Sequence, residues 1–207
     1  MKASQAAGLI ATGLFALSTT TVTAEVMQAA HQKTHLKGTY SYTGQGACLY
    51  SPAGFDPVAL TTLGNSTNSN FSVTGTWVWD GAGNSALSAT IVSISYAPSA
   101  VGTGFVPSAS SVSVKATFKS SGYGADGGFT ETMQSFVGTF LTGARKGQTF
   151  TVSNTQEQAY ISQDGKALTM AGISPDIQTQ TVYNAAGSVV ATQQRICNGS
   201  RTMVRLS

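Results

Sequence analysis

The feature that most constrains this fold is an alternation of apolar and polar side chains with a period of two residues. It is clearest at 71–79, "FSVTGTWVW", where Trp77 and Trp79 fall on one face and Thr74 and Thr76 on the other. A second clean example is 112–119, "VSVKATFK". This period is typical of a β-strand with one buried face and does not fit an amphipathic helix. The chain is therefore expected to fold as half-buried strands.

Short clusters of Gly, Asn and Asp separate these stretches, at 80–84 ("DGAGN"), 163–165 ("QDG") and 184–187 ("NAAG"), and such clusters favour tight turns. Strands are predicted at 40–43, 71–79, 87–96, 112–119, 129–141 (as one strand or two), 148–153, 158–162, 166–171, 178–183, 188–197 and 202–206. Because each strand follows closely on the last, the sequence predicts an all-β protein, an antiparallel up-and-down β-barrel of about 8–10 strands. A β-sandwich is the alternative.

The first residues are typical of an export signal. Lys2 precedes an apolar run at 6–17, and small residues end the segment at 22–24. The run is too short to span a bilayer, so 1–24 is predicted to be a signal peptide, 25–36 an N-terminal arm and 37–207 a single β-barrel domain. The protein is expected to be exported, to the periplasm or the extracellular space. An integral membrane protein is not expected: no later stretch is long and apolar enough for a helix, and an outer-membrane barrel would need an apolar outside.

Cys48 and Cys197 are the only two cysteines, and they lie near opposite ends of the predicted domain. In an oxidising compartment two lone cysteines are expected to form a disulfide. Such a bridge requires the first and last strands to lie side by side, as in a closed sheet. In the chain-entropy model it stabilises the fold by at most about 5 kcal/mol.

Charge is sparse and excludes one class of partner. Only 9% of the residues are charged and the net charge is +3, against about a quarter charged in an average soluble domain. No basic cluster exceeds the "ARK" of 144–146. A nucleic-acid partner is therefore not expected, because its electrostatic footprint is missing.

Residues for catalysis or metal binding are few. The only histidines, His31 and His35, are four positions apart in the N-terminal arm, where no third ligand is evident, so no metal site and no cofactor are predicted. Asp80, Asp126 and Asp164 lie in Gly-containing turns, where Asp side chains bind backbone amides.

Glu131 is the exception among the acids, because it lies within a strand. If it faced inward, burial would raise its pKa and suit it to proton transfer. An outward-facing Glu131 is the alternative. This makes Glu131 the candidate catalytic residue, although the shortage of other groups argues against an enzyme.

The aromatic residues suggest a different role. Tyr40, Tyr42, Trp77 and Trp79 form same-face pairs on predicted strands. In a barrel of about eight strands such side chains either fill the interior or line a cavity for a small ligand. The long segments 51–70 and 97–111, rich in Gly, Ser and Asn, are predicted to be loops beside that cavity.

Gly38-Thr39-Tyr40 at the first strand and an arginine in the last strand resemble the calycins, the superfamily of lipocalins and avidins. The chain is also similar to uncharacterised exported bacterial β-barrel proteins with a Gly-x-Tyr, a Cys and an "SPAGF" segment. In lipocalins the first motif carries Trp, and an arginine from the last strand packs over it at the barrel floor. The resemblance implies a calycin-like barrel with Arg205 or Arg201 in that role, and it adds Arg205 to the candidate ligand-binding residues.

Taken together, these patterns predict an exported, non-catalytic β-barrel that binds a small apolar or aromatic ligand. Two alternatives remain open: a barrel enzyme of isomerase or cyclase type, and a structural or adhesive surface protein without a cavity. An ionisable residue in a cavity would favour the enzyme, and a solid interior would favour the structural protein. The sequence carries no indication of oligomeric state.

Overall fold

In the computed structural model, which describes residues 36–96, 107–153 and 155–206, the chain forms ten β-strands. Every strand pairing between them is antiparallel. The strands are β1 (Lys37–Ser51), β2 (Thr67–Asp80), β3 (Asn84–Tyr96), β4 (Ser108–Ser121), β5 (Gly128–Phe140), β6 (Thr149–Val152), β7 (Gln156–Ile161), β8 (Ala167–Gly172), β9 (Ile177–Tyr183) and β10 (Val189–Arg205).

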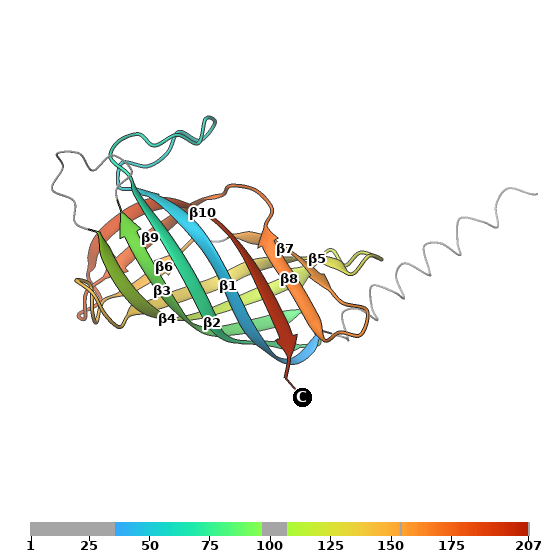
Figure 1. Ribbon diagram of the computed structural model, residues 1–207. Coiled ribbons are helices and arrows are strands. Elements are labelled where there is room, and N and C mark those ends of the chain that lie inside the picture. Colours follow the sequence, from blue (N-terminus) through green and yellow to red (C-terminus); the bar gives the residue numbers. More distant parts are fainter. Residues whose placement is uncertain (1–35, 97–106, 154, 207) are drawn as a thin grey trace, which may run out of the picture.

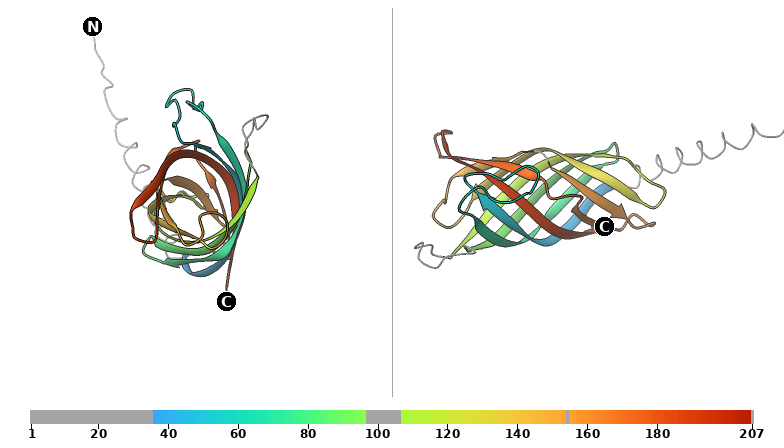
Figure 2. Two further views of the ribbon diagram at one scale, coloured as in Figure 1. Left: turned by 90° about the vertical axis from the view of Figure 1, so that its left-hand side faces the viewer. Right: turned by 90° about the horizontal axis from the view of Figure 1, so that it is seen from above.

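The strands close into a ring with up-and-down order (Figure 1). β1 to β5 are neighbours in chain order, and β10 returns to pair with β1. β5 pairs with both β6 and β7, and β10 pairs with both β9 and β8, so these four short strands fill two places in the ring. The result is a ring of eight strands, two of them interrupted, that is not evenly round one axis (Figure 2). The predicted all-β up-and-down fold is confirmed.

The ring closes where the first and last strands meet. β1 and β10 stay in register from Tyr40 opposite Arg205 to Ser51 opposite Gln194. Cys48 lies directly opposite Cys197, and the two form a disulfide. The predicted bridge and the juxtaposition of the chain's first and last strands are both confirmed.

Several strands are longer than the sequence pattern indicates. β1 extends over Lys37–Ser51 instead of 40–43, and 188–197 and 202–206 are parts of one strand, β10. The predicted loop 51–70 narrows to 52–66 because β2 begins at Thr67, and β4 already begins at Ser108 within the predicted loop 97–111. Ser, Asn and Gly have weak strand preference, but a neighbouring strand on each side supplies the hydrogen bonds that hold them extended.

The ring has two ends, which differ in their connections. At the floor end lie the short turns 81–83, 122–127 and 162–166, and at the mouth end the connections 52–66, 141–148 and 184–188. In the floor-end turns the carboxylates of Asp80, Asp126 and Asp164 each accept a backbone N–H, as predicted. These bonds fix the turns from within.

The predicted signal peptide 1–24 and all but the last residue of the predicted arm 25–36 lie outside the described residues. That last residue, Leu36, is buried in the core at the floor end. The part of the chain that the structure describes contains no helix long and apolar enough to cross a membrane.

Candidate functional site: the barrel lumen

A cavity of about 440 Å³ occupies the mouth half of the ring. Trp77 and Phe118 border it at its deep end, and Ser95, Ser108 and Arg145 border it near the mouth. This volume lies in the range of pockets that hold small organic molecules. Large rings fill the floor end, whereas toward the mouth the inward residues of β1, β9 and β10 are mostly small or polar and leave space opposite the aromatic side chains of β2, β5 and β6.

One side of the cavity lies on β2 to β6 and is mainly apolar, with serines of β2 to β4 such as Ser93 and Ser110 among its lining residues. Its aromatic side chains are held by close packing rather than by hydrogen bonds. The ring of Phe71 lies over Gly46 of β1, where an added Cβ would come within 2.6 Å of Phe71 Cζ. Phe150 contacts Phe140 and Phe136, with ring centroids 5.1 and 5.8 Å away. The apolar lining includes Phe71, Val73, Ile91, Phe136, Phe140 and Phe150.

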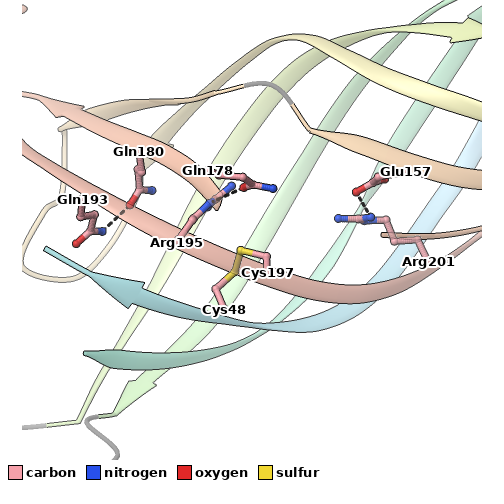
Figure 3. The surroundings of a disulfide bond; sticks show 8 residues. All are labelled: Cys48, Glu157, Gln178, Gln180, Gln193, Arg195, Cys197 and Arg201. Carbon is pink, nitrogen blue, oxygen red and sulfur yellow. Dashed lines mark hydrogen bonds and ion pairs between the residues drawn. A yellow bond between two sulfur atoms is a disulfide. The ribbon is translucent and has the colours of Figure 1, made fainter. Parts of the chain in front are cut away.

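The opposite side is polar and follows β10 (Figure 3). Near the mouth, Gln193 Nε2 donates to Gln180 Oε1 over 2.6 Å. Next along the strand, Arg195 Nε donates to Gln178 Oε1 over 2.9 Å. Because consecutive inward residues of a strand are two apart, Gln193 and Arg195 project into the same space.

The polar side continues past the disulfide to an ion pair. Arg201 of β10 donates to Glu157 of β7, and both side chains are largely buried. Burial raises the pKa of the neighbouring Tyr42 phenol, and the Arg201 charge opposes that shift. The pair therefore holds one positive and one negative charge together, close to the floor of the cavity.

The floor itself is a cluster of aromatic rings. Trp77 and Trp79 are stacked with ring centroids 5.1 Å apart, and Tyr40 and Tyr42 meet them edge-on at 5.1 and 5.5 Å. Phe118 packs against Trp77 from β4 at 4.6 Å. Tyr40 also donates its hydroxyl to the carbonyl of Gly165 in a floor-end turn. These contacts fill the interior below the cavity.

Glu131 faces inward but lies below this floor, away from the cavity. It is fully buried, and its Oε1 accepts hydrogen bonds from Trp79 Nε1 and Ser120 Oγ, both over 2.7 Å. Burial raises its pKa to about 7, although the two hydrogen bonds oppose the shift. Its carboxyl group is therefore built into the packed core and does not border the space that a lumen ligand would occupy.

The structure separates the predicted ligand-binding residues into two groups. Tyr42 and Trp77 border the cavity, and for them the predicted role stays a prediction. Tyr40, Trp79 and Arg205 lie at the floor end and do not border it. Arg205 extends beside Gly38, whose added Cβ would lie 3.2 Å from Arg205 Nε. Of the two arginines considered, only Arg201 reaches the lumen.

The candidate metal ligands His31 and His35 lie outside the described residues. Within residues 36–96, 107–153 and 155–206, no three His, Cys, Asp or Glu side chains are grouped to hold a metal ion.

Sequence reasoning missed the polar side of the lumen, in particular Gln178, Gln180, Gln193 and Arg195. A usable signal was present, since residues that differ from Cys197 by an even number share its face of the strand. Cys197 has to face its disulfide partner, and Gln193, Arg195 and Arg201 have the same parity. Splitting β10 into two strands hid this relation.

The sequence matches no protein-family model and no curated protein. The resemblance to calycins therefore stays a prediction, and the functional argument depends on the geometry of the lumen.

Proposed function

We propose that this protein is an exported, non-catalytic binding protein that holds a small apolar or aromatic molecule in the mouth half of its barrel. The observation that carries the proposal is the 440 Å³ cavity above a floor formed by Trp77. Its wall from β2 to β6 offers aromatic and aliphatic surface, and burial of such surface drives ligand binding. The disulfide agrees with an exported protein, because it needs an oxidising compartment.

The structural alternative requires a solid interior, and the cavity counts against it. The enzyme alternative requires an ionisable group in the cavity, which Tyr42, Asp176 and Glu157 all supply, and the most buried carboxylate is that of Glu157. Its carboxylate is, however, ion-paired with Arg201, and a paired carboxylate is a poor proton acceptor. Glu131, the residue predicted to transfer a proton, lies below the floor. Binding without catalysis therefore fits the arrangement best.

Titration with N-phenyl-1-naphthylamine, a neutral dye that fluoresces when it leaves water, tests the proposal. We expect saturable binding of one dye molecule per chain. Ile91→Trp would fill part of the cavity, because Ile91 faces the lumen from β3, and we expect it to weaken dye binding about tenfold or more.

The matched control is Thr90→Trp, the adjacent position on the exposed face of the same strand. It adds the same indole outside the lumen, and we expect the dye affinity to stay within about twofold of the unsubstituted protein. Absence of saturable dye binding, or equal loss in both variants, would contradict a lumen site.

A further inference from the structure

The charged groups that border the cavity do not balance. They comprise three arginines, Arg145, Arg195 and Arg201, and two carboxylates, Glu157 and Asp176. Glu157 forms an ion pair with Arg201, and Asp176 accepts a hydrogen bond from Ser174. Arg145 lies near the mouth, with its guanidinium carbon 5.9 Å from the centre of the Phe140 ring. Arg145, Arg195 and Asp176 form no ion pair within the described residues, so the lining carries one excess positive charge, and of the two unpaired arginines Arg195 lies deeper in the lumen.

The position of Arg195 is fixed by its neighbours. Its Nε is bound to Gln178 Oε1, and its guanidinium carbon lies 6.0 Å from the centre of the Phe136 ring. The hydrogen bond to Gln178 uses one of the five N–H groups of the guanidinium. Its terminal nitrogens make no hydrogen bond with the described residues. The group is therefore held in place with most of its donors free.

The neighbouring glutamines present more donors. Arg195 can only donate, so Gln178 has to turn its oxygen toward Arg195 and its NH₂ group elsewhere. Gln180 likewise gives its oxygen to Gln193, which leaves the NH₂ group of Gln180 free of that bond. At the floor, the buried Trp77 Nε1 has no hydrogen-bond partner among the described residues. Arg195, Gln178 and Gln180 therefore present several donors close together on one side of the lumen, and the complement of that group is an acceptor.

We propose that the lumen ligand is an amphipathic organic anion, whose acidic group is bound by Arg195 and Gln178 and whose apolar body packs against Phe71, Phe136 and Phe150. This inference rests on the proposed function, because it names the chemical class of molecule that occupies the same cavity. An anion supplies the charge that Arg195 lacks, and a carboxylate accepts the parallel bonds of a guanidinium with good geometry. The aromatic side of the cavity requires that the rest of the molecule be apolar.

Competition between two isosteric molecules tests this inference. Bound N-phenyl-1-naphthylamine is displaced by 2-naphthoic acid, ionised at pH 7, or by neutral 2-naphthamide. We expect the acid to bind about tenfold or more tightly than the amide, because a charged hydrogen-bonded pair contributes that much. In Arg195→Gln the preference should vanish, and a cooperative urea denaturation of the same variant shows that the barrel is still folded.

Two further variants complete the design. Arg195→Lys keeps the charge and should restore part of the preference for the acid. Arg145→Gln removes an arginine that borders the same cavity near the mouth, and it should retain the preference. Equal displacement by acid and amide, or a preference that survives in Arg195→Gln, would overturn the inference and leave the proposed function intact. If the dye does not bind at all, the proposed function itself is contradicted, and the inference with it.

Discussion

The two halves of this barrel are built on the same strands, yet one is solid and the other hollow. At the floor end Trp77 and Trp79 stack, Tyr40 packs edge-on against Trp79, and these rings leave no space for a ligand. Toward the mouth the inward positions of the same strands include small residues such as Gly46 and Ser69, and the Phe71 ring between them lines the cavity wall instead of filling the interior. The width of the ring stays fixed along its axis while the inward side chains of each strand change in size. The interior of the ring therefore changes from a packed core to a cavity. The floor end therefore supplies stability, and the mouth end supplies the space for binding.

The largest expected effect comes from the solid half. Trp79→Ala removes a fully buried ring and leaves Glu131 without one of its two hydrogen-bond donors, so we expect a loss of about 3–5 kcal/mol in the free energy of unfolding. Phe140→Ala, in the hollow half, removes a half-buried ring and should cost about 1 kcal/mol. Urea denaturation measures both. Similar losses at the two positions would erase the distinction between the halves.

The disulfide joins the strands that close the ring, and its removal should lower the stability less than Trp79→Ala does. Replacing Cys48 and Cys197 together by Ser is expected to lower the free energy of unfolding by about 2–4 kcal/mol, because the unfolded chain gains conformational entropy when the bridge no longer closes it into a loop. The register of β1 with β10 should survive, since backbone hydrogen bonds flank the bridge on both sides. The mass of the unsubstituted protein should be two hydrogens below that of its reduced form. If the double variant unfolds at room temperature, the ladder alone does not close the ring.

A third expectation concerns pH and is smaller still. The pKa of Glu131 is raised by burial from 4.5 in the unfolded chain to about 7 in the fold. The folded state therefore binds the proton more tightly than the unfolded state. The stabilisation of the fold by this protonation is fully present below pH 4.5 and is lost as the pH rises through 7. Between pH 5 and pH 7 this group should lower the free energy of unfolding by an amount on the order of 2 kcal/mol.

Glu131→Gln should remove that slope, because the amide oxygen can still accept from Trp79 and Ser120 and carries no charge. Urea denaturation at pH 5 and pH 7 measures the difference between the two proteins. Equal slopes in both would mean that Glu131 does not titrate in this range. Dye binding should be unchanged in the variant, since Glu131 lies below the cavity floor.

The fold was largely predictable from the chain, and for a physical reason. A strand with one buried face has to alternate, so Trp77, Trp79 and Phe118 placed their strands and faced inward as expected. The cysteines predicted which strands meet, since a disulfide joins only neighbouring backbones. What the pattern missed was length: Thr, Ser and Gly extend β1 and β10 well beyond their apolar positions. Whether those residues are extended depends on pairing with the neighbouring strands, and a single sequence does not show which strands pair.

The site was less predictable than the fold. Aromatic residues indicated a lumen, but not where the solid core ends and the cavity begins, which depends on how rings from separate strands stack. Arg195 gave no signal of its own, because an arginine in a polar strand is usually solvent-exposed. Its place in the site follows from the strand register. Arg195 is two residues from Cys197 and so lies on the same, inward face of β10, and the pairing of β9 with β10 places Gln178 beside it.

The most direct test of a hollow, anion-binding mouth half is an X-ray structure of the protein with 6-bromo-2-naphthoic acid, with bromine located by its anomalous scattering. We predict one bromine peak inside the ring, above Trp77 and beside the aromatic wall, with the carboxylate of the molecule at Arg195. Bromine bound only on the outer surface, or an empty lumen at a concentration that saturates the protein in solution, would contradict the account.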